Sequence, residues 1–291
     1  MKITIPQRAD APNTNLYVDI ITISGSKLGD RAVIFLIPGG PGGNHTVFYE
    51  IQDELLRYGD LVLFDPRGCG QSDASAAKYC SLNSYIDDIQ AIRERLCLGK
   101  IILLGGSYGA MAALGYAVKY NEYLEKLILL GGAPSYRFLE TAKVNLKNRG
   151  SLEQKIAAKS LFDGTFKDDE HFKKYYQITS SLYLFKKEAQ QNASPTTRSN
   201  VPYNIEITNF GFSDFLRKFN FENELKNISC NTLILAGKND WINDPKHSRF
   251  MAKHIQKSQL VIFDDCGHFI WADQREKFFQ ALNNFLIPSR E

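Results

Sequence analysis

The stretch IILLGGSYGAMAALGYAV, residues 101–118, passes from an apolar run through a glycine-rich turn with one serine into a helical pattern. The first four residues are continuously apolar, which is typical of a strand buried on both faces. Gly105, Ser107 and Gly109 form the pattern Gly-x-Ser-x-Gly at the turn. Between a strand and a helix, this pattern indicates a nucleophilic serine on a strained turn, with an ordinary helix-capping serine as the alternative.

Similar apolar runs that end in turn residues recur at 32–37, 61–64, 127–130, 232–235 and 260–263. Amphipathic stretches at 84–98 and 110–120 lie between some of these runs. This alternation predicts an α/β fold with a mostly parallel sheet flanked by helices. Residues 2–5 and 17–23 predict two further strands, which we expect to be antiparallel.

The alternation stops after GGAP at 131–134 and resumes near residue 226. The residues between are charged, aromatic and mostly helix-like, with a looser part at 192–203. We therefore predict a core made of residues 1–135 and 226–291, with 136–225 inserted as a mainly helical cap. Such a cap would cover the carboxyl ends of the strands, where open α/β sheets bind ligands. A domain that only packs against the core is the alternative.

The charge balance and the apolar runs of the chain indicate which kinds of binding partner to exclude. The 291 residues carry a net charge of +3, with 35 basic and 32 acidic side chains and no basic block, which argues against a nucleic-acid or membrane partner. The start, MKITIPQRADAPNTN, has no apolar segment of the kind that a signal peptide needs. No apolar run is long enough to predict a membrane-spanning helix.

Cysteine usage predicts a cytoplasmic location. The five cysteines are widely scattered and odd in number, which indicates reduced thiols. Cys69 and Cys266 lie beside motif loops, and we expect both to be buried thiols without a role. Neither a phosphate-binding glycine motif nor any other feature indicates a cofactor or a metal ion.

A serine hydroxyl is a weak nucleophile and requires a general base that an acid orients. When the serine lies on such a turn, the acid and then the histidine follow it in the chain. His45 precedes the serine, whereas His268 follows the last apolar run, so we predict His268 as the base. Asp240 follows the preceding run and is predicted to orient His268, with Asp244 as the competing acid.

Acyl transfer creates an oxyanion that preorganised N–H groups must stabilise. One donor should be the N–H of Tyr108, directly after the serine. The loop PGGPGG at 38–43 follows the run at 32–37 and is predicted to supply the second donor, because glycine lets backbone approach a ligand closely.

Five motifs in the same order resemble the prolyl aminopeptidases (proline iminopeptidases) of the α/β-hydrolase fold: PGGPGG (38–43), DPRGCGQS (65–72), GGSYGA (105–110), GKND (237–240) and GHFIW (267–271). The resemblance implies a triad of Ser107, Asp240 and His268. It also implies an oxyanion hole formed by the backbone of Gly39 and Tyr108. We interpret Asp65 and Arg67 in the second motif as a salt-bridged turn.

Two departures concern the first motif and the substrate amine. The family usually begins the first motif with histidine, where this chain has Pro38. Some members carry a glutamate directly after the triad aspartate, where this chain has Trp241. Glu206 matches a glutamate of the family's lid, and Trp241 occupies the position of the other glutamate. We therefore predict Glu206 and Trp241 as substrate-binding residues. A plain surface charge is the alternative for Glu206.

The resemblance implies an aminopeptidase that releases N-terminal proline, or another small apolar residue, from short peptides. A carboxylesterase, lactonase or amidase of the same fold, acting on other small acyl substrates, is the alternative. An intact serine, aspartate and histidine argue against a non-catalytic binding protein. Cap aromatics at 172, 175, 176, 183 and 185 would line the pocket for a proline ring or form the core of the cap.

Overall fold

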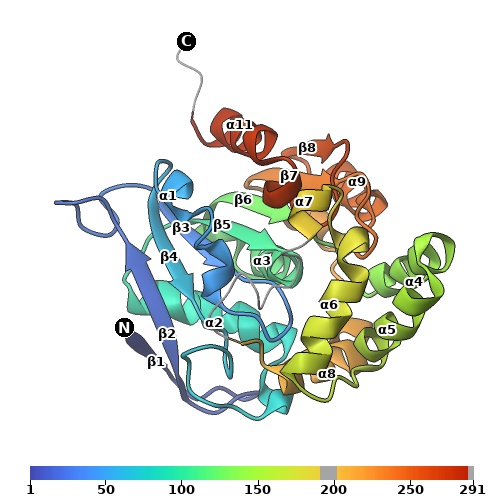
Figure 1. The fold of residues 1–291 in the computed structure, drawn as a ribbon. Helices are drawn as coiled ribbons and strands as arrows, with labels where there is room; N and C mark the ends of the chain where they lie inside the picture. Colours follow the sequence, from blue (N-terminus) through green and yellow to red (C-terminus); the bar gives the residue numbers. More distant parts are fainter. Residues whose placement is uncertain (191–201, 288–291) are drawn as a thin grey trace.

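The computed structural model describes residues 1–190 and 202–287. Within them the strands form one eight-stranded sheet of order β1-β2-β4-β3-β5-β6-β7-β8 (Figure 1). The strands are β1 (Lys2–Ile5), β2 (Thr14–Ile21), β3 (Val33–Ile37), β4 (Asp60–Phe64), β5 (Ile101–Gly106), β6 (Leu124–Leu130), β7 (Asn231–Gly237) and β8 (Ser258–Phe263). β1 and β2 are antiparallel to each other, β2 is antiparallel to β4, and all later pairs are parallel. The predicted α/β class is confirmed, including the antiparallel pair at the N-terminus.

The central strands are buried along their whole length. Every residue of β3, β4 and β5 is buried, whereas β2 near the sheet edge alternates between buried and half-buried positions. Because side chains of a strand point alternately to the two faces, a strand that is buried at every position must be covered on both faces of the sheet.

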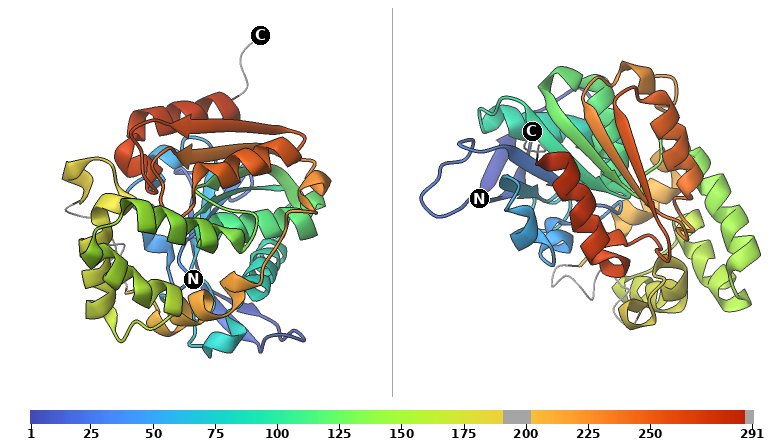
Figure 2. Two further views of the ribbon diagram at one scale, coloured as in Figure 1. Left: turned by 90° about the vertical axis from the view of Figure 1, so that its right-hand side faces the viewer. Right: turned by 90° about the horizontal axis from the view of Figure 1, so that it is seen from above.

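Helices cover both faces of the sheet. On one face, α2 (Leu82–Arg95), α3 (Tyr108–Lys119) and α9 (Pro245–His254) pack into the larger apolar cluster. On the other face lie α1 (Gln52–Leu55), α10 (Ile270–Asp273) and α11 (Arg275–Leu286). Figure 2 shows α11 and α9 on opposite sides of the sheet. Short 3₁₀ turns occupy His45–Phe48, Ala77–Tyr79, Asn121–Tyr123, Phe215–Arg217 and Leu225–Asn227.

Between β6 and β7 the chain forms α4 (Arg137–Arg149), α5 (Leu152–Asp163), α6 (Asp169–Tyr183), α7 (Lys187–Gln190) and α8 (Ile205–Ser213). The helices α4, α5, α6 and α8 gather on the side of the molecule away from β1 and β2 (Figure 1). Most of the stretch predicted as looser, 192–203, lies outside the described residues. The division into a core of 1–135 and 226–291 and a cap of 136–225 stays a prediction.

Each of the five cysteines is a free thiol, and Cys69 and Cys266 are buried as expected. Burial raises the pKa of both thiols, so they are poor nucleophiles. None of the helices in residues 1–190 and 202–287 combines the length and the apolar character that a bilayer crossing requires.

Candidate active site

Ser107 occupies the turn between β5 and α3, at the carboxyl end of a central strand. Its backbone angles, φ 57° and ψ −119°, lie in a region that residues with a side chain rarely adopt. Such a conformation costs about 1–3 kcal/mol and persists only where the surrounding structure enforces it. Here the Ser107 N–H donates to the Leu130 carbonyl on β6 at 2.8 Å. The sequence therefore places its serine on a strained turn, as predicted.

The two glycines of the motif allow this turn to pack against the sheet. A Cβ atom on Gly109 would lie 2.1 Å from the Ile37 carbonyl oxygen, and one on Gly105 would lie 2.3 Å from the Gly109 carbonyl oxygen. Both obstacles are backbone atoms, which cannot rotate away as a side chain could. The start of α3 therefore lies closer to β3 than any residue with a side chain would permit.

Replacement of Gly109 by alanine is expected to lower the free energy of unfolding by about 1–3 kcal/mol, because the added methyl group overpacks the turn. The higher helix propensity of alanine offsets at most about 1 kcal/mol of this loss in the free energy of unfolding. Gly106→Ala is the matched control, since a Cβ there meets no heavy atom within 4 Å. Urea unfolding curves measure the difference. Equal midpoints for the two variants would contradict this account of the turn.

His268 and Asp240 lie on neighbouring loops, after β8 and β7 respectively. The His268 Nδ1 and the Asp240 Oδ2 are 2.6 Å apart, and both side chains are buried. The other carboxylate oxygen, Oδ1, accepts the N–H groups of Ile242 and Asn243 at 3.0 Å each. An ionised carboxylate can only accept a hydrogen bond, so this contact favours the neutral tautomer of His268 with the proton on Nδ1 and with Nε2 free to accept one. That tautomer is the one a general base requires.

Asp244, the competing acid, has other partners, and so do two further titratable residues near these loops, Asp264 and His247. Asp244 caps the first turn of α9 and accepts from Asn145 at 3.0 Å, and Asp264 pairs with Lys238 at 2.7 Å on the surface. His247 is buried against the Thr141 hydroxyl at 3.0 Å, and burial lowers its pKa. Of the candidate acids, Asp240 has the contact with His268.

The glycine loop at 38–43 lies directly against the serine turn. A Cβ on Gly39 would lie 2.9 Å from the Gly106 carbonyl oxygen and 3.3 Å from the Ser107 Cβ. Tyr108 is the first residue of α3, where the backbone N–H has no partner within the helix. The backbone groups of both predicted oxyanion donors thus lie next to Ser107, and their role stays a prediction.

Contacts from the inserted helices hold this loop. The Thr208 hydroxyl donates to the Pro41 carbonyl at 2.8 Å, and the Asn204 N–H donates to the Gly42 carbonyl at 2.9 Å. Gly42 has φ 89°, and a Cβ there would lie 2.4 Å from the Asn204 carbonyl oxygen. The first turn of α8 therefore packs on the loop at backbone distance.

Sequence reasoning missed the role of His45, which it excluded as a base. Both the N–H and the Nδ1 of His45 contact Oδ1 of Asp65, at 2.9 and 2.6 Å, and Nε2 contacts the Tyr49 hydroxyl at 2.8 Å. The second Asp65 oxygen accepts the Gln71 N–H at 2.8 Å. His45 thus ties the end of the glycine loop to the DPRG loop, although position 38 has proline. The sequence signal that could have indicated this contact is the Asn44-His45 pair directly after Gly43, the last glycine of the loop.

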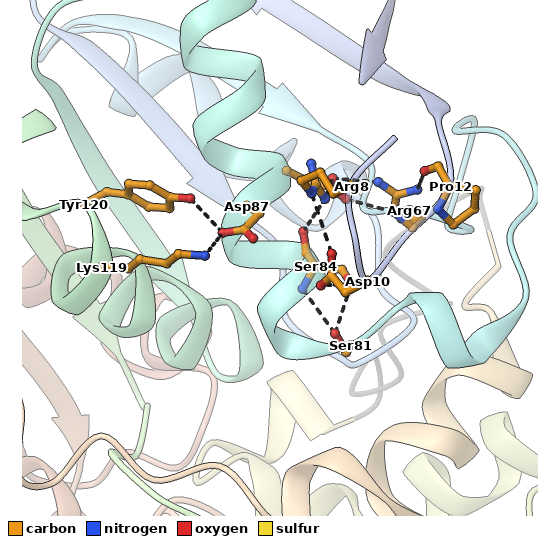
Figure 3. A network of polar contacts seen from close by, with 10 residues as sticks. Arg8, Asp10, Pro12, Arg67, Ser81, Ser84, Asp87, Lys119 and Tyr120 are labelled. Carbon is orange, nitrogen blue, oxygen red and sulfur yellow. Dashed lines mark hydrogen bonds and ion pairs between the residues drawn. The ribbon is translucent and has the colours of Figure 1, made fainter. Parts of the chain in front are cut away.

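The interpretation of Asp65 and Arg67 as a salt-bridged turn is wrong. Arg67 turns away from Asp65 and donates to both oxygens of buried Asp88 on α2, at 3.2 and 2.9 Å. It also donates to the Pro12 carbonyl at 2.6 Å, beside Arg8, which shares Asp88 (Figure 3). Asp65 is occupied by His45, so the arginine pairs with a carboxylate that is 21 residues away in sequence.

A pocket of about 940 Å³, its open mouth included, lies above the serine. Ser107, His268 and Gly39 form part of its wall. Most of the remaining wall is apolar or aromatic: Val47, Phe48, Leu130, Leu161, Phe172, Tyr176, Tyr183, Tyr203, Phe212, Ile242, Phe269 and Trp271. Among the described residues, no aspartate or glutamate lines it. The site can therefore enclose a small apolar group next to the serine.

The aromatic residues of the predicted cap do not all line the pocket beside Ser107. Phe172, Tyr176 and Tyr183 line the pocket, while Tyr175 lies behind them and its hydroxyl is 2.7 Å from that of Tyr183. Phe185 is exposed. The Tyr183 carbonyl also accepts the backbone N–H of His268 at 2.7 Å, so the end of α6 contacts the histidine loop.

The two predicted substrate-binding residues lie outside the described wall of the pocket. Glu206 is exposed in the first turn of α8. Trp241 is fully buried, with its ring 5.4 Å from that of Tyr183 and 6.2 Å from that of Phe162. Contact of either residue with a substrate stays a prediction.

Comparison with solved structures shows the fold. The chain superposes on an esterase from Exiguobacterium antarcticum with a TM-score of 0.75 and 24% identity, covering 99% of this chain and 100% of the other. It superposes on the proline iminopeptidase of Mycobacterium smegmatis with a TM-score of 0.73 and 20% identity, covering 98% and 97%. At these identities the likeness concerns architecture alone.

Comparison of sequences shows the family. Residues 32–273 match the family described as alpha/beta hydrolase fold. The chain is 30% identical over 282 residues to the proline iminopeptidase PfmaB of Pestalotiopsis fici, covering 92% of this chain and 99% of that protein. It is 28% identical over 282 residues to the proline iminopeptidase of Saccharolobus solfataricus, covering 94% and 89%. The chain therefore belongs to the proline iminopeptidase family of the α/β-hydrolase fold.

Proposed function

We propose that the protein is a serine aminopeptidase that releases N-terminal proline, or another small apolar residue, from short peptides. The observation that carries the proposal is the 2.6 Å contact between His268 and Asp240 in a pocket whose wall includes the strained Ser107. Membership of the proline iminopeptidase family supports the choice of substrate. From the cysteine usage, we also propose a cytoplasmic location.

In the proposed reaction, the Ser107 oxygen attacks the carbonyl carbon of the first residue, and Nε2 of His268 takes the hydroxyl proton. The carbonyl oxygen becomes an oxyanion, stabilised by the N–H groups of Gly39 and Tyr108. Collapse breaks the C–N bond, and His268 gives its proton to the leaving amine. Water then enters, loses a proton to His268 and bonds to the acyl carbon through its oxygen. The bond between that carbon and the Ser107 oxygen breaks, His268 returns the proton to the Ser107 oxygen, and the free amino acid leaves. Asp240 stays ionised and stabilises the imidazolium.

The pocket walls suit the ring of a proline. Aromatic faces from α6 and aliphatic side chains from the core enclose the space in front of Ser107. Burial of a hydrophobic ring contributes about 25 cal/mol per Å² of apolar surface removed from water. The walls thus supply affinity for a small apolar side chain without a specific polar contact.

A second candidate function follows from the same walls. A peptide's N-terminal amine is a cation at neutral pH, and burying an unpaired cation costs several kcal/mol. Because no carboxylate lines the described part of the pocket, a neutral acyl group is accommodated at lower cost. This favours a carboxylesterase, lactonase or amidase as the alternative to the aminopeptidase.

Substrate pairs test the proposal. Proline p-nitroanilide and other aminoacyl p-nitroanilides carry the free amine, and p-nitrophenyl acetate lacks it. We expect hydrolysis of the proline anilide by the wild-type enzyme and none above background by the Ser107→Ala variant. Hydrolysis of the ester, with none of any free-amine substrate, would contradict the aminopeptidase and support the second candidate.

Replacement of Glu206 by glutamine distinguishes the predicted amine contact from its alternative, a plain surface charge, which the exposed position favours. Because the Glu206 side chain is exposed and outside the described wall, we expect the KM for proline p-nitroanilide and for p-nitrophenyl acetate to stay within about twofold of wild type. Steady-state kinetics with both substrates measure this. A raised KM for the anilide alone would instead show that the carboxylate binds the amine.

A further inference from the structure

The peptide group that joins Pro38 to Gly39 has an anchor outside the glycine loop. The hydroxyl of Tyr85, on α2, donates to the Pro38 carbonyl oxygen at 3.0 Å. Tyr85 is only 4% exposed, and burial raises the pKa of its hydroxyl well above the ordinary value. The hydroxyl therefore keeps its proton and remains a donor across the working pH range.

This contact sets the direction of the Gly39 N–H. In a planar trans peptide the C=O of one residue and the N–H of the next point in opposite directions. The bond from Tyr85 to the Pro38 oxygen thus orients the Gly39 N–H away from Tyr85. Among the described residues, no hydrogen bond uses that N–H. Gly39 separates two spaces, since it lines both the pocket with Ser107 and a smaller cavity lined by Tyr85.

Tyr85 also contacts the residue that carries the second predicted donor. Its ring packs against the ring of Tyr108 with centroids 5.5 Å apart, and both rings are buried. The Phe64 ring also packs against the Tyr85 ring, with centroids 5.8 Å apart. Because the buried Tyr85 side chain packs against both rings, its hydroxyl is a rigid point of attachment for the Pro38 carbonyl.

We propose that Tyr85 is a positioning residue for the oxyanion hole, holding the Gly39 N–H toward the oxyanion through the Pro38 carbonyl. This inference rests on the proposed serine hydrolase mechanism. Removal of one oxyanion donor typically lowers kcat by about 10²- to 10³-fold. Loss of its alignment alone should have a smaller effect, about tenfold on kcat, because the N–H itself remains.

The test replaces Tyr85 by phenylalanine, which removes the hydroxyl and keeps the ring. Tyr116→Phe is the matched control, because Tyr116 is also buried and donates its hydroxyl, to Gln90 at 2.6 Å, and lines neither cavity. Kinetics use proline p-nitroanilide and p-nitrophenyl acetate. Both variants are assayed at a temperature at which their circular dichroism matches that of wild type, so that unfolding does not contribute.

We expect Y85F to lower kcat about tenfold on the substrate that turns over, with KM within about twofold, and Y116F to leave both constants unchanged. A boronic acid analogue of that substrate, which forms a tetrahedral adduct, should bind Y85F about tenfold more weakly. An unchanged kcat in Y85F, or an equal fall in Y116F, would overturn the inference. Ser107→Ala is measured in parallel, because full activity in that variant would refute the proposed mechanism instead.

Discussion

Replacement of Ser107 by alanine is expected to lower kcat about 10⁴- to 10⁶-fold on any acyl substrate that the protein hydrolyses. Ser107 lies on a turn whose strained backbone angles direct its side chain into the pocket that His268 also lines. Loss of the nucleophile removes the covalent step, and only oxyanion stabilisation and binding remain, which together leave a residual rate above that of water.

Two measurements make this result specific to Ser107. Ser248→Ala is the matched control, since Ser248 is fully buried on α9 and lies outside the pocket, and we expect it to retain wild-type kcat. A serine-directed sulfonyl fluoride should label the peptide that contains Ser107 in the wild-type protein and leave the variant unlabelled. Wild-type activity in Ser107→Ala would refute the triad.

Replacement of Asp240 by asparagine is expected to lower kcat by about 10⁴-fold, the size of effect that a wrong histidine tautomer produces. The structure gives the reason. Because the N–H groups of Ile242 and Asn243 both point at Oδ1, an asparagine there would direct its oxygen to them and its NH₂ group to His268. Nδ1 of His268 would then accept a hydrogen bond, and the proton would move to Nε2. In that tautomer the histidine cannot take the proton of Ser107.

Asp244→Asn is the matched control for this prediction. Asp244 is the competing acid of the sequence analysis, but its carboxylate caps α9 at Lys246. Asparagine serves as well as aspartate at that position, so kcat should stay within about twofold of wild type. The comparison is made by kcat at saturating substrate. A fall in Asp244→Asn as large as in Asp240→Asn would reassign the acid.

The elements that the sequence predicts well are those with a local signal. The apolar runs of four to six residues became parts of β3 to β8, because a continuous apolar run requires cover on both faces of the sheet. The serine turn was predictable for a related reason. Glycine on both sides of Ser107 is needed where a Cβ would lie within 2.3 Å of a backbone atom. In both cases the sequence signal lies in residues that are close together in the chain.

The partners of the motif residues were not predictable in the same way. Sequence spacing suggests an ion pair between Arg67 and Asp65, two residues away. In the structure Arg67 instead pairs with Asp88 on α2. Asp65 is hydrogen-bonded to His45, which chain order excludes only as the general base. An ion pair or hydrogen bond depends on which side chains the fold brings within about 3 Å, and sequence spacing carries little information on that.

By itself, the sequence determined the fold class, through its apolar runs, and the family, through the resemblance of its motifs. It also predicted the order of serine, acid and histidine. Only the tertiary structure decided that Tyr85 and α8 hold the glycine loop, that Glu206 is exposed, and that an apolar wall faces Ser107. These properties arise from contacts between segments far apart in the chain. We expect substrate choice to depend on them, because the pocket beside Ser107 is lined both by residues of the helices between β6 and β7 and by residues outside that segment.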